Sequence, residues 1–96
     1  MGKLIIHRKN EITYRMTEFH VILNNKDIGI LENGRKIMIE LEKGNYELMI
    51  KGGFIKSNRL NFHLEKGETK EFVAESFKKG FIKNYIKLSQ LKRSGA

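Results

Sequence analysis

Residues 37–50 of the chain read IMIELEKGNYELMI and contain two alternating apolar runs around one turn. The apolar positions of the two runs are Ile37, Ile39 and Leu41, and then Tyr46, Leu48 and Ile50. Strict alternation places successive side chains on opposite faces of a pleated strand. Between the runs, Lys43-Gly44-Asn45 predicts a tight turn, because glycine adopts backbone angles that other residues avoid. The stretch therefore predicts two short strands, each with one face toward a core.

The same alternation continues on both sides of this stretch. It recurs at Phe19, Val21 and Leu23 and again at Leu60, Phe62 and Leu64. We predict strands over residues 3–8, 17–24, 27–31, 35–42, 45–51, 59–65 and 69–76. The expected core consists of alternating apolar residues, namely Val21, Leu23, Ile37, Ile39, Leu48, Ile50, Leu60, Phe62 and Leu64.

Turn-forming residues separate the expected strands about every 8–12 residues, a spacing typical of a sandwich or barrel. Asn33-Gly34 predicts a type I′ hairpin turn, in which both central residues take positive φ angles. Asn24 to Asp27 predicts another hairpin, and Lys66-Gly67-Glu68 another tight turn. The sequence thus predicts an all-β fold, a small antiparallel β-sandwich of about seven to eight short strands.

Length and composition narrow the class of protein. The 96 residues fit a single domain over residues 1–96. Cysteine is absent, which excludes disulfides and thiolate metal sites and fits a reducing compartment. No secretory signal or membrane-spanning run is recognisable, so we expect a cytoplasmic protein. The formal net charge of +8 favours anionic partners.

Positive charge concentrates in the basic C-terminal segment, residues 78–96, which has no acidic residue. The candidate polyanion-binding residues are its basic side chains, Lys78, Lys79, Lys83, Lys87, Lys92 and Arg93. Lysines neutralise phosphates, and the interleaved Phe81 and Tyr85 either stack on unpaired bases or belong to the core. An anionic membrane surface or an acidic protein fits the same charges. The alternative is a solvated basic edge that blocks unwanted strand pairing.

The secondary structure of residues 81–91 is ambiguous in the sequence. Phe81, Tyr85 and Leu88 have helical spacing, whereas Ile86 and Leu88 alternate around Lys87 as in a strand. We predict a final strand, because an all-β core could use it.

No pattern indicates catalysis or a cofactor. The histidines, His7, His20 and His63, have no short metal-ligand spacing. The alternating carboxylates of Glu40, Glu42 and Glu47 are interleaved with lysines, as expected for cross-strand ion pairs on a solvated face. No serine lies in a Gly-x-Ser-x-Gly motif, and no phosphate-binding glycine loop is present. We therefore predict a protein that is not an enzyme and has no catalytic, cofactor-binding or metal site.

Residues 19–77 resemble small bacterial β-sandwich modules of the PEGA-like kind. The resemblance rests on LEKGNYELMIK, Leu41 to Lys51, where a tight turn precedes an aromatic residue, and on KSNRLNFHLEKGE, Lys56 to Glu68. The chain lacks the Pro-Glu-Gly-Ala tetrapeptide of the family's name. The resemblance implies an Ig-like or PEGA-like sandwich that behaves as a module, and it carries no catalytic residues.

Two functional hypotheses follow. The first is a non-catalytic interaction module that binds another protein, such as an accessory or inhibitor protein of bacterial or phage origin. The alternative is a small nucleic-acid- or anionic-surface-binding β-domain that uses the basic C-terminal segment. The sequence leaves the partner's identity and the oligomeric state open.

Overall fold

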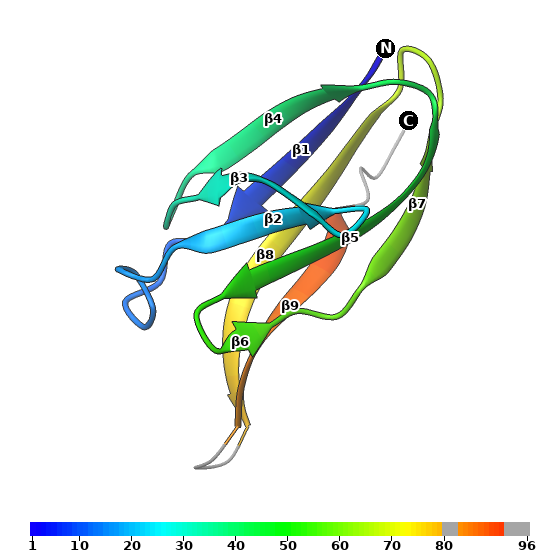
Figure 1. The fold of residues 1–96 in the computed structure, drawn as a ribbon. Coiled ribbons are helices and arrows are strands. Elements are labelled where there is room, and N and C mark those ends of the chain that lie inside the picture. The colour runs from blue at the N-terminus through cyan, green and yellow to red at the C-terminus, as the bar shows by residue number, and fades with distance from the viewer. Residues whose placement is uncertain (80–82, 92–96) are drawn as a thin grey trace.

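The computed structural model of the protein describes residues 1–79 and 83–91, and all regular structure in this part of the chain is β-strand. The strands are β1 Gly2–Arg8, β2 Phe19–Leu23, β3 Lys26–Leu31, β4 Lys36–Leu41, β5 Gly44–Gly52, β6 Ile55–Lys56, β7 Leu60–Leu64, β8 Thr69–Lys79 and β9 Lys83–Leu91. They form two sheets that pack face to face (Figure 1). One sheet has the order β4-β1-β8-β9, and the other has the order β3-β2-β5-β6 with β7 also paired to β5. The all-β sandwich is confirmed, and β9 is the predicted final strand.

One strand pair departs from the expected antiparallel pattern. β1 and β8 run parallel, with Ile6 opposite Phe72 in the register. Parallel strands cannot be joined by a hairpin and need a long crossover connection. Here five of the six strands between β1 and β8 belong to the second sheet, so the crossover contains much of the fold. Local patterns of alternation and turns carry no signal of such a distant pairing.

The Asn33-Gly34 turn differs from its prediction in both place and type. It joins β3 in one sheet to β4 in the other, so it links the layers and closes no hairpin. Gly34 has a φ of +72°, whereas Asn33 is not among the described residues with positive φ. The Arg35 amide donates to the Glu32 carbonyl at 3.0 Å. A hydrogen-bonded turn with positive φ only at its third residue is a type II turn.

The type I′ geometry occurs instead at Asn24-Asn25. Their φ angles are +50° and +64°, and they join the paired strands β2 and β3. Asparagine tolerates this region better than most residues, because its short side chain bonds locally. Lys43-Gly44 is a further correction, since it also connects the two sheets and Gly44 has no positive φ.

Both sheets contribute to one hydrophobic core. Of the predicted core residues, six on β2, β5 and β7 are buried, namely Val21, Leu23, Leu48, Ile50, Phe62 and Leu64. Three others, Ile37, Ile39 and Leu60, are half-buried and pack against them. The first, eighth and ninth strands add core residues that the prediction omitted, namely Leu4, Ile6, Phe72, Ala74, Ile86 and Leu88. The core therefore extends to the basic C-terminal segment.

A set of hydrogen bonds joins the two sheets along one side of the sandwich. Ser57 forms a parallel bridge with Ile86 of β9, and its hydroxyl accepts the amide of Ile50 at 2.8 Å. The Asn58 side chain donates to the Leu88 carbonyl and accepts from the Leu88 amide, both at 2.9 Å. Its amide therefore replaces a neighbouring peptide group at the outer edge of β9. Through these contacts, β5 and β6 are held beside β9.

Candidate functional site

The hairpin of β8 and β9 continues past the rest of the sandwich (Figure 1). Its register extends to Lys79 opposite Lys83, although the buried core residues of the two strands stop at Ala74 and Ile86. We call its outer part, residues 75–79 and 83–87, the hairpin end. The sequence of this hairpin supplies most of the candidate polyanion-binding residues.

An aromatic pair lies on the outer face of the hairpin end. Phe77 and Tyr85 are register partners, and their rings stack with centroids 5.7 Å apart and an interplanar angle of 20°. Because Ala74 and Ile86 face the core, alternation directs Phe77 and Tyr85 to the exterior. Phe77 is 38% exposed and Tyr85 is half-buried. Tyr85 is thus no core residue, and Phe81, its predicted companion, lies outside the described residues.

Lysines precede and follow this aromatic pair along the hairpin. Lys78 and Lys87 are exposed, and neither forms an ion pair within the described residues. Lys87 stands opposite Glu75 in the register, but the Glu75 carboxylate contacts Lys9 at 3.2 Å. On the other side of the aromatic pair, the next outward register pair is Lys79 opposite Lys83. Lys92 and Arg93, the remaining predicted residues, lie outside the described residues.

A second pair of facing lysines lies nearby, and the sequence interpretation missed it. Lys51 of β5 is the register partner of Lys56 of β6. Both are exposed, and neither has an acidic partner among the described residues. The signal was present in the sequence, because two lysines flank the Gly52-Gly53 turn at positions that face each other in a hairpin. Like charges directly opposite each other destabilise a strand pair.

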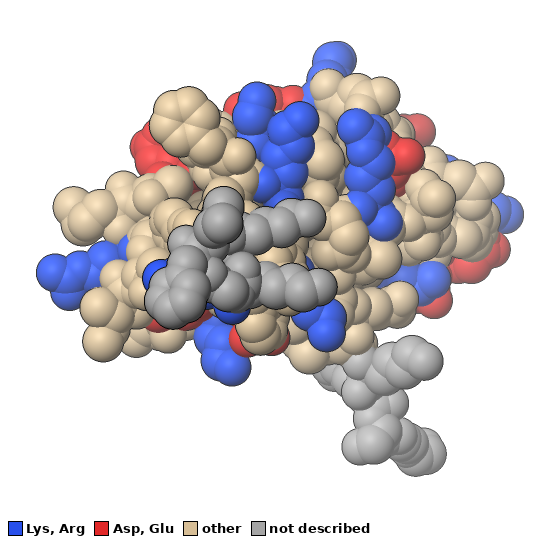
Figure 2. Space-filling model, turned by 90° about the horizontal axis from the view of Figure 1, so that it is seen from below, with Lys and Arg blue, Asp and Glu red and all other residues tan. Residues whose placement is uncertain are grey.

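The bridge between Ser57 and Ile86 brings this lysine pair to the aromatic pair. Both bridged residues are buried. Their predecessors, Lys56 and Tyr85, therefore face the opposite side, which is solvent. We call the resulting series the lysine–aromatic row, and it runs in the order Lys51, Lys56, Tyr85, Phe77. Figure 2 views this end of the molecule and shows basic side chains standing out from it on several sides.

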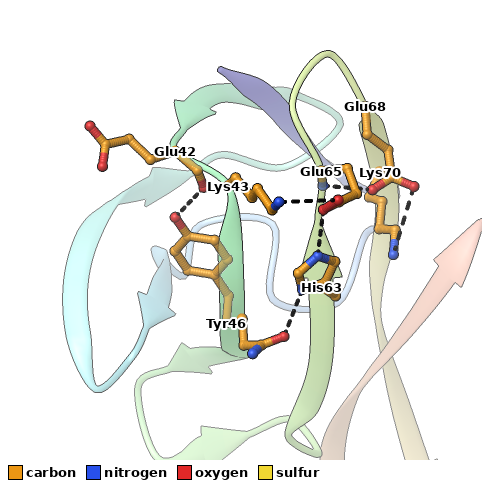
Figure 3. A network of polar contacts seen from close by, with 8 residues as sticks. Glu42, Lys43, Tyr46, His63, Glu65, Glu68 and Lys70 are labelled. Atoms are coloured by element: carbon orange, nitrogen blue, oxygen red, sulfur yellow. Dashed lines mark hydrogen bonds and ion pairs between the residues drawn. The ribbon is translucent and has the colours of Figure 1, made fainter.

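The histidines form polar contacts elsewhere on the surface. His63 lies 2.8 Å from both Asn45 and Glu65, and Lys43 lies 3.6 Å from Glu65 (Figure 3). The hydrogen bond from His63 lowers the pKa of the Glu65 carboxyl, and the charge of Lys43 acts in the same direction. All these groups are exposed, so the network resembles ordinary cross-strand ion pairing.

The other two histidines have comparable partners. His7 contacts Glu71 at 2.8 Å, and His20 contacts Asp27 at 2.7 Å. No group of three or more His, Asp or Glu side chains in the described part of the chain is arranged to hold a metal ion.

Arg8 is a buried cation that sequence analysis did not single out. Its guanidinium donates to the carbonyls of Thr17 at 2.8 Å, Leu31 at 2.9 Å and Tyr14 at 2.6 Å. It also lies 3.5 Å above the ring of Phe19. Burial lowers the pKa of Arg8, and the charge of Glu11 opposes that shift. Because two of these carbonyls, those of Tyr14 and Thr17, lie in the loop between β1 and β2, Arg8 fixes that loop.

Comparisons of the chain with known protein families, curated proteins and solved structures found no match. The PEGA-like resemblance therefore stays a prediction. Within residues 1–79 and 83–91, the chain forms no helix with the length and apolar character needed to cross a bilayer.

Proposed function

We propose that the protein is a non-catalytic module that binds nucleic acid through the hairpin end. One observation carries the proposal: an outward, stacked pair of aromatic rings, Phe77 and Tyr85, lies between lysine-bearing positions of the same hairpin. This geometry favours the second functional hypothesis over a purely protein-binding module. We keep the cytoplasm as the proposed compartment, because the chain has no cysteine.

The chemistry of the hairpin end suits a nucleic acid. Each lysine that neutralises a phosphate releases condensed counterions, which makes binding favourable at low salt. Aromatic rings provide faces on which bases stack without sequence preference. An isolated basic hairpin without exposed rings would attract any polyanion, whereas Phe77 at 38% exposure adds a surface for bases.

Replacement of four lysines tests the proposal. In the variant K78Q/K79Q/K83Q/K87Q, we expect weaker binding of labelled nucleic acid and a flatter salt dependence. Each lost phosphate contact reduces the log–log slope by about 0.7–0.9, so four contacts reduce it by about 3. Fluorescence anisotropy over a salt series measures both effects. Circular dichroism should show intact folding, because solvated lysines contribute little to stability.

A control variant with the same change in net charge separates the loss of contacts at the hairpin end from the effect of the lower net charge of the whole protein. K3Q/K26Q/K36Q/K66Q removes four exposed lysines that have no ion pair among the described residues. We expect this control to keep most of the wild-type slope. Equal losses in the two variants, or no wild-type binding at about 50 mM salt, would contradict the proposal, because electrostatic binding is strong at that salt.

A second candidate function is binding of a protein by strand addition. The outer edge of β4 has no partner among the described strands, and Met38 on that strand is 53% exposed. An unpaired edge accepts an extended peptide through main-chain hydrogen bonds. An accessory or inhibitor role of bacterial or phage origin belongs to this candidate. Salt-insensitive binding to a protein, abolished by Ile39→Pro on β4, would support it.

A further inference from the structure

We infer that the nucleic acid is single-stranded and follows the lysine–aromatic row, so that Lys51 and Lys56 belong to the binding site. The inference rests on the proposed function. It adds the class of nucleic acid that binds and a second group of binding residues. The site then spans two neighbouring hairpins, β5–β6 and β8–β9, and includes residues outside the basic C-terminal segment.

Charge placement around the row supports this inference. Lys51 and Lys56 are both exposed and face each other in register. Facing like charges are unfavourable. Elsewhere on the exterior some charged side chains lie beside opposite charges, as in Arg59 with Glu47 at 2.7 Å. A bound phosphate chain would neutralise the Lys51–Lys56 pair.

The position of the rings selects a single strand. In a duplex the bases stack on each other and present only their edges, so a protein ring reaches a base face only after unstacking. A single strand exposes its base faces, and Phe77 and Tyr85 form a flat stacked pair at the surface. The row crosses three strand spacings of about 4.8 Å, which places lysines and rings within about 14 Å.

The test compares K51Q/K56Q with the control K36Q/K66Q, using labelled oligo-dT of about 12 nucleotides, within the usual site sizes. For a single strand, two lost contacts reduce the slope of log affinity against log salt by about 1.4. Taken from 1 M down to 50 mM salt, that slope change corresponds to about sixtyfold weaker binding. The control removes two exposed lysines away from the row, and we expect less than about a threefold loss because salt screens distant charges. Circular dichroism checks that both variants fold.

Two further measurements address the class of ligand. A duplex of the same length should bind more weakly than the single strand, and vesicles of phosphatidylcholine and phosphatidylserine should compete poorly. Phe77→Leu and Tyr85→Leu should each weaken binding of the single strand by about 5- to 150-fold, the range found for loss of one stacking ring. Their folding is checked in the same way.

The failures can be told apart. If K51Q/K56Q binds like K36Q/K66Q while the hairpin-end variant loses binding, the inference about Lys51 and Lys56 is wrong and the proposed function stands. Equal or tighter binding of duplex, or preferential binding of vesicles, overturns the single-strand inference. If the wild-type protein binds no nucleic acid at about 50 mM salt, the proposed function and the inference fail together.

Discussion

Replacement of Arg8 by methionine should destabilise the domain and release the loop between β1 and β2. Arg8 is 3% exposed, and its guanidinium bonds the carbonyls of Tyr14, Thr17 and Leu31. Methionine fills a similar volume but donates no hydrogen bond. The substitution therefore removes a guanidinium donor from each of three carbonyls in one step.

The expected magnitude follows from the burial of each acceptor. The bond to the Leu31 carbonyl is buried, and an unsatisfied buried acceptor costs about 1–3 kcal/mol. The bonds to Tyr14 and Thr17 are part-buried, so water partly replaces the lost donors. Loss of the cation–π contact with Phe19 adds about 1 kcal/mol. The total is about 3 kcal/mol, and a domain of this size loses about 4–8 °C in melting temperature per kcal/mol.

The assay combines thermal unfolding with amide hydrogen exchange. The Thr17 amide, which donates to the Tyr14 carbonyl at 2.9 Å, should exchange faster in Arg8→Met. Arg8→Lys should recover little, because an ammonium cannot fork to several carbonyls or stack on a ring as a guanidinium does. Arg35→Met is the matched control, since Arg35 is exposed and should change stability by less than about 0.5 kcal/mol. If Arg8→Met melts like this control, or if exchange at Thr17 is unchanged, the role assigned to Arg8 is wrong.

Two further predictions concern a turn and a titrating pair. Gly34→Val should lower stability by about 1–3 kcal/mol, because a β-branched residue is strained at a φ of +72°, and an unchanged urea midpoint would show that the turn rearranges freely. His63→Gln should raise the pKa of Glu65 toward its ordinary value, as measured by NMR titration of the carboxyl carbon. Since that pKa is lowered in the folded protein, the pair's stabilisation is present above the ordinary carboxyl pKa and is lost as pH falls through the lowered pKa. An identical titration curve in the variant would assign the shift to another group.

Alternation predicted the strands well because it reports a local property of each strand. Side chains in β2, β5 and β7 follow period two, and their burial follows it as well. Pairing between distant strands leaves no such signal, so the parallel contact of β1 with β8 was not predicted. The prediction for the Asn33-Gly34 turn was wrong for a related reason. The dipeptide indicates a chain reversal, whereas the choice between a hairpin and a link between sheets depends on where the following strand pairs.

The candidate site was predicted only in part, because local sequence patterns do not report which strands lie side by side. Charge density along the chain identified the basic hairpin, but the facing of Lys51 and Lys56 depends on the β5–β6 register. Tyr85 illustrates a different limit. Its aromatic character alone does not distinguish a core ring from a surface ring, and only the burial of Ile86 fixes the outward direction of its neighbour.

The contacts that close one side of the sandwich also create the proposed site. Asn58 satisfies both backbone groups of Leu88, so this part of the outer edge of β9 is not free to pair with another strand. The adjoining bridge from Ser57 to Ile86 holds β6 against β9. Without that bridge, the β5–β6 lysines and the aromatic pair would belong to separate surfaces. The residues that stabilise the edge therefore determine which cations lie beside the rings.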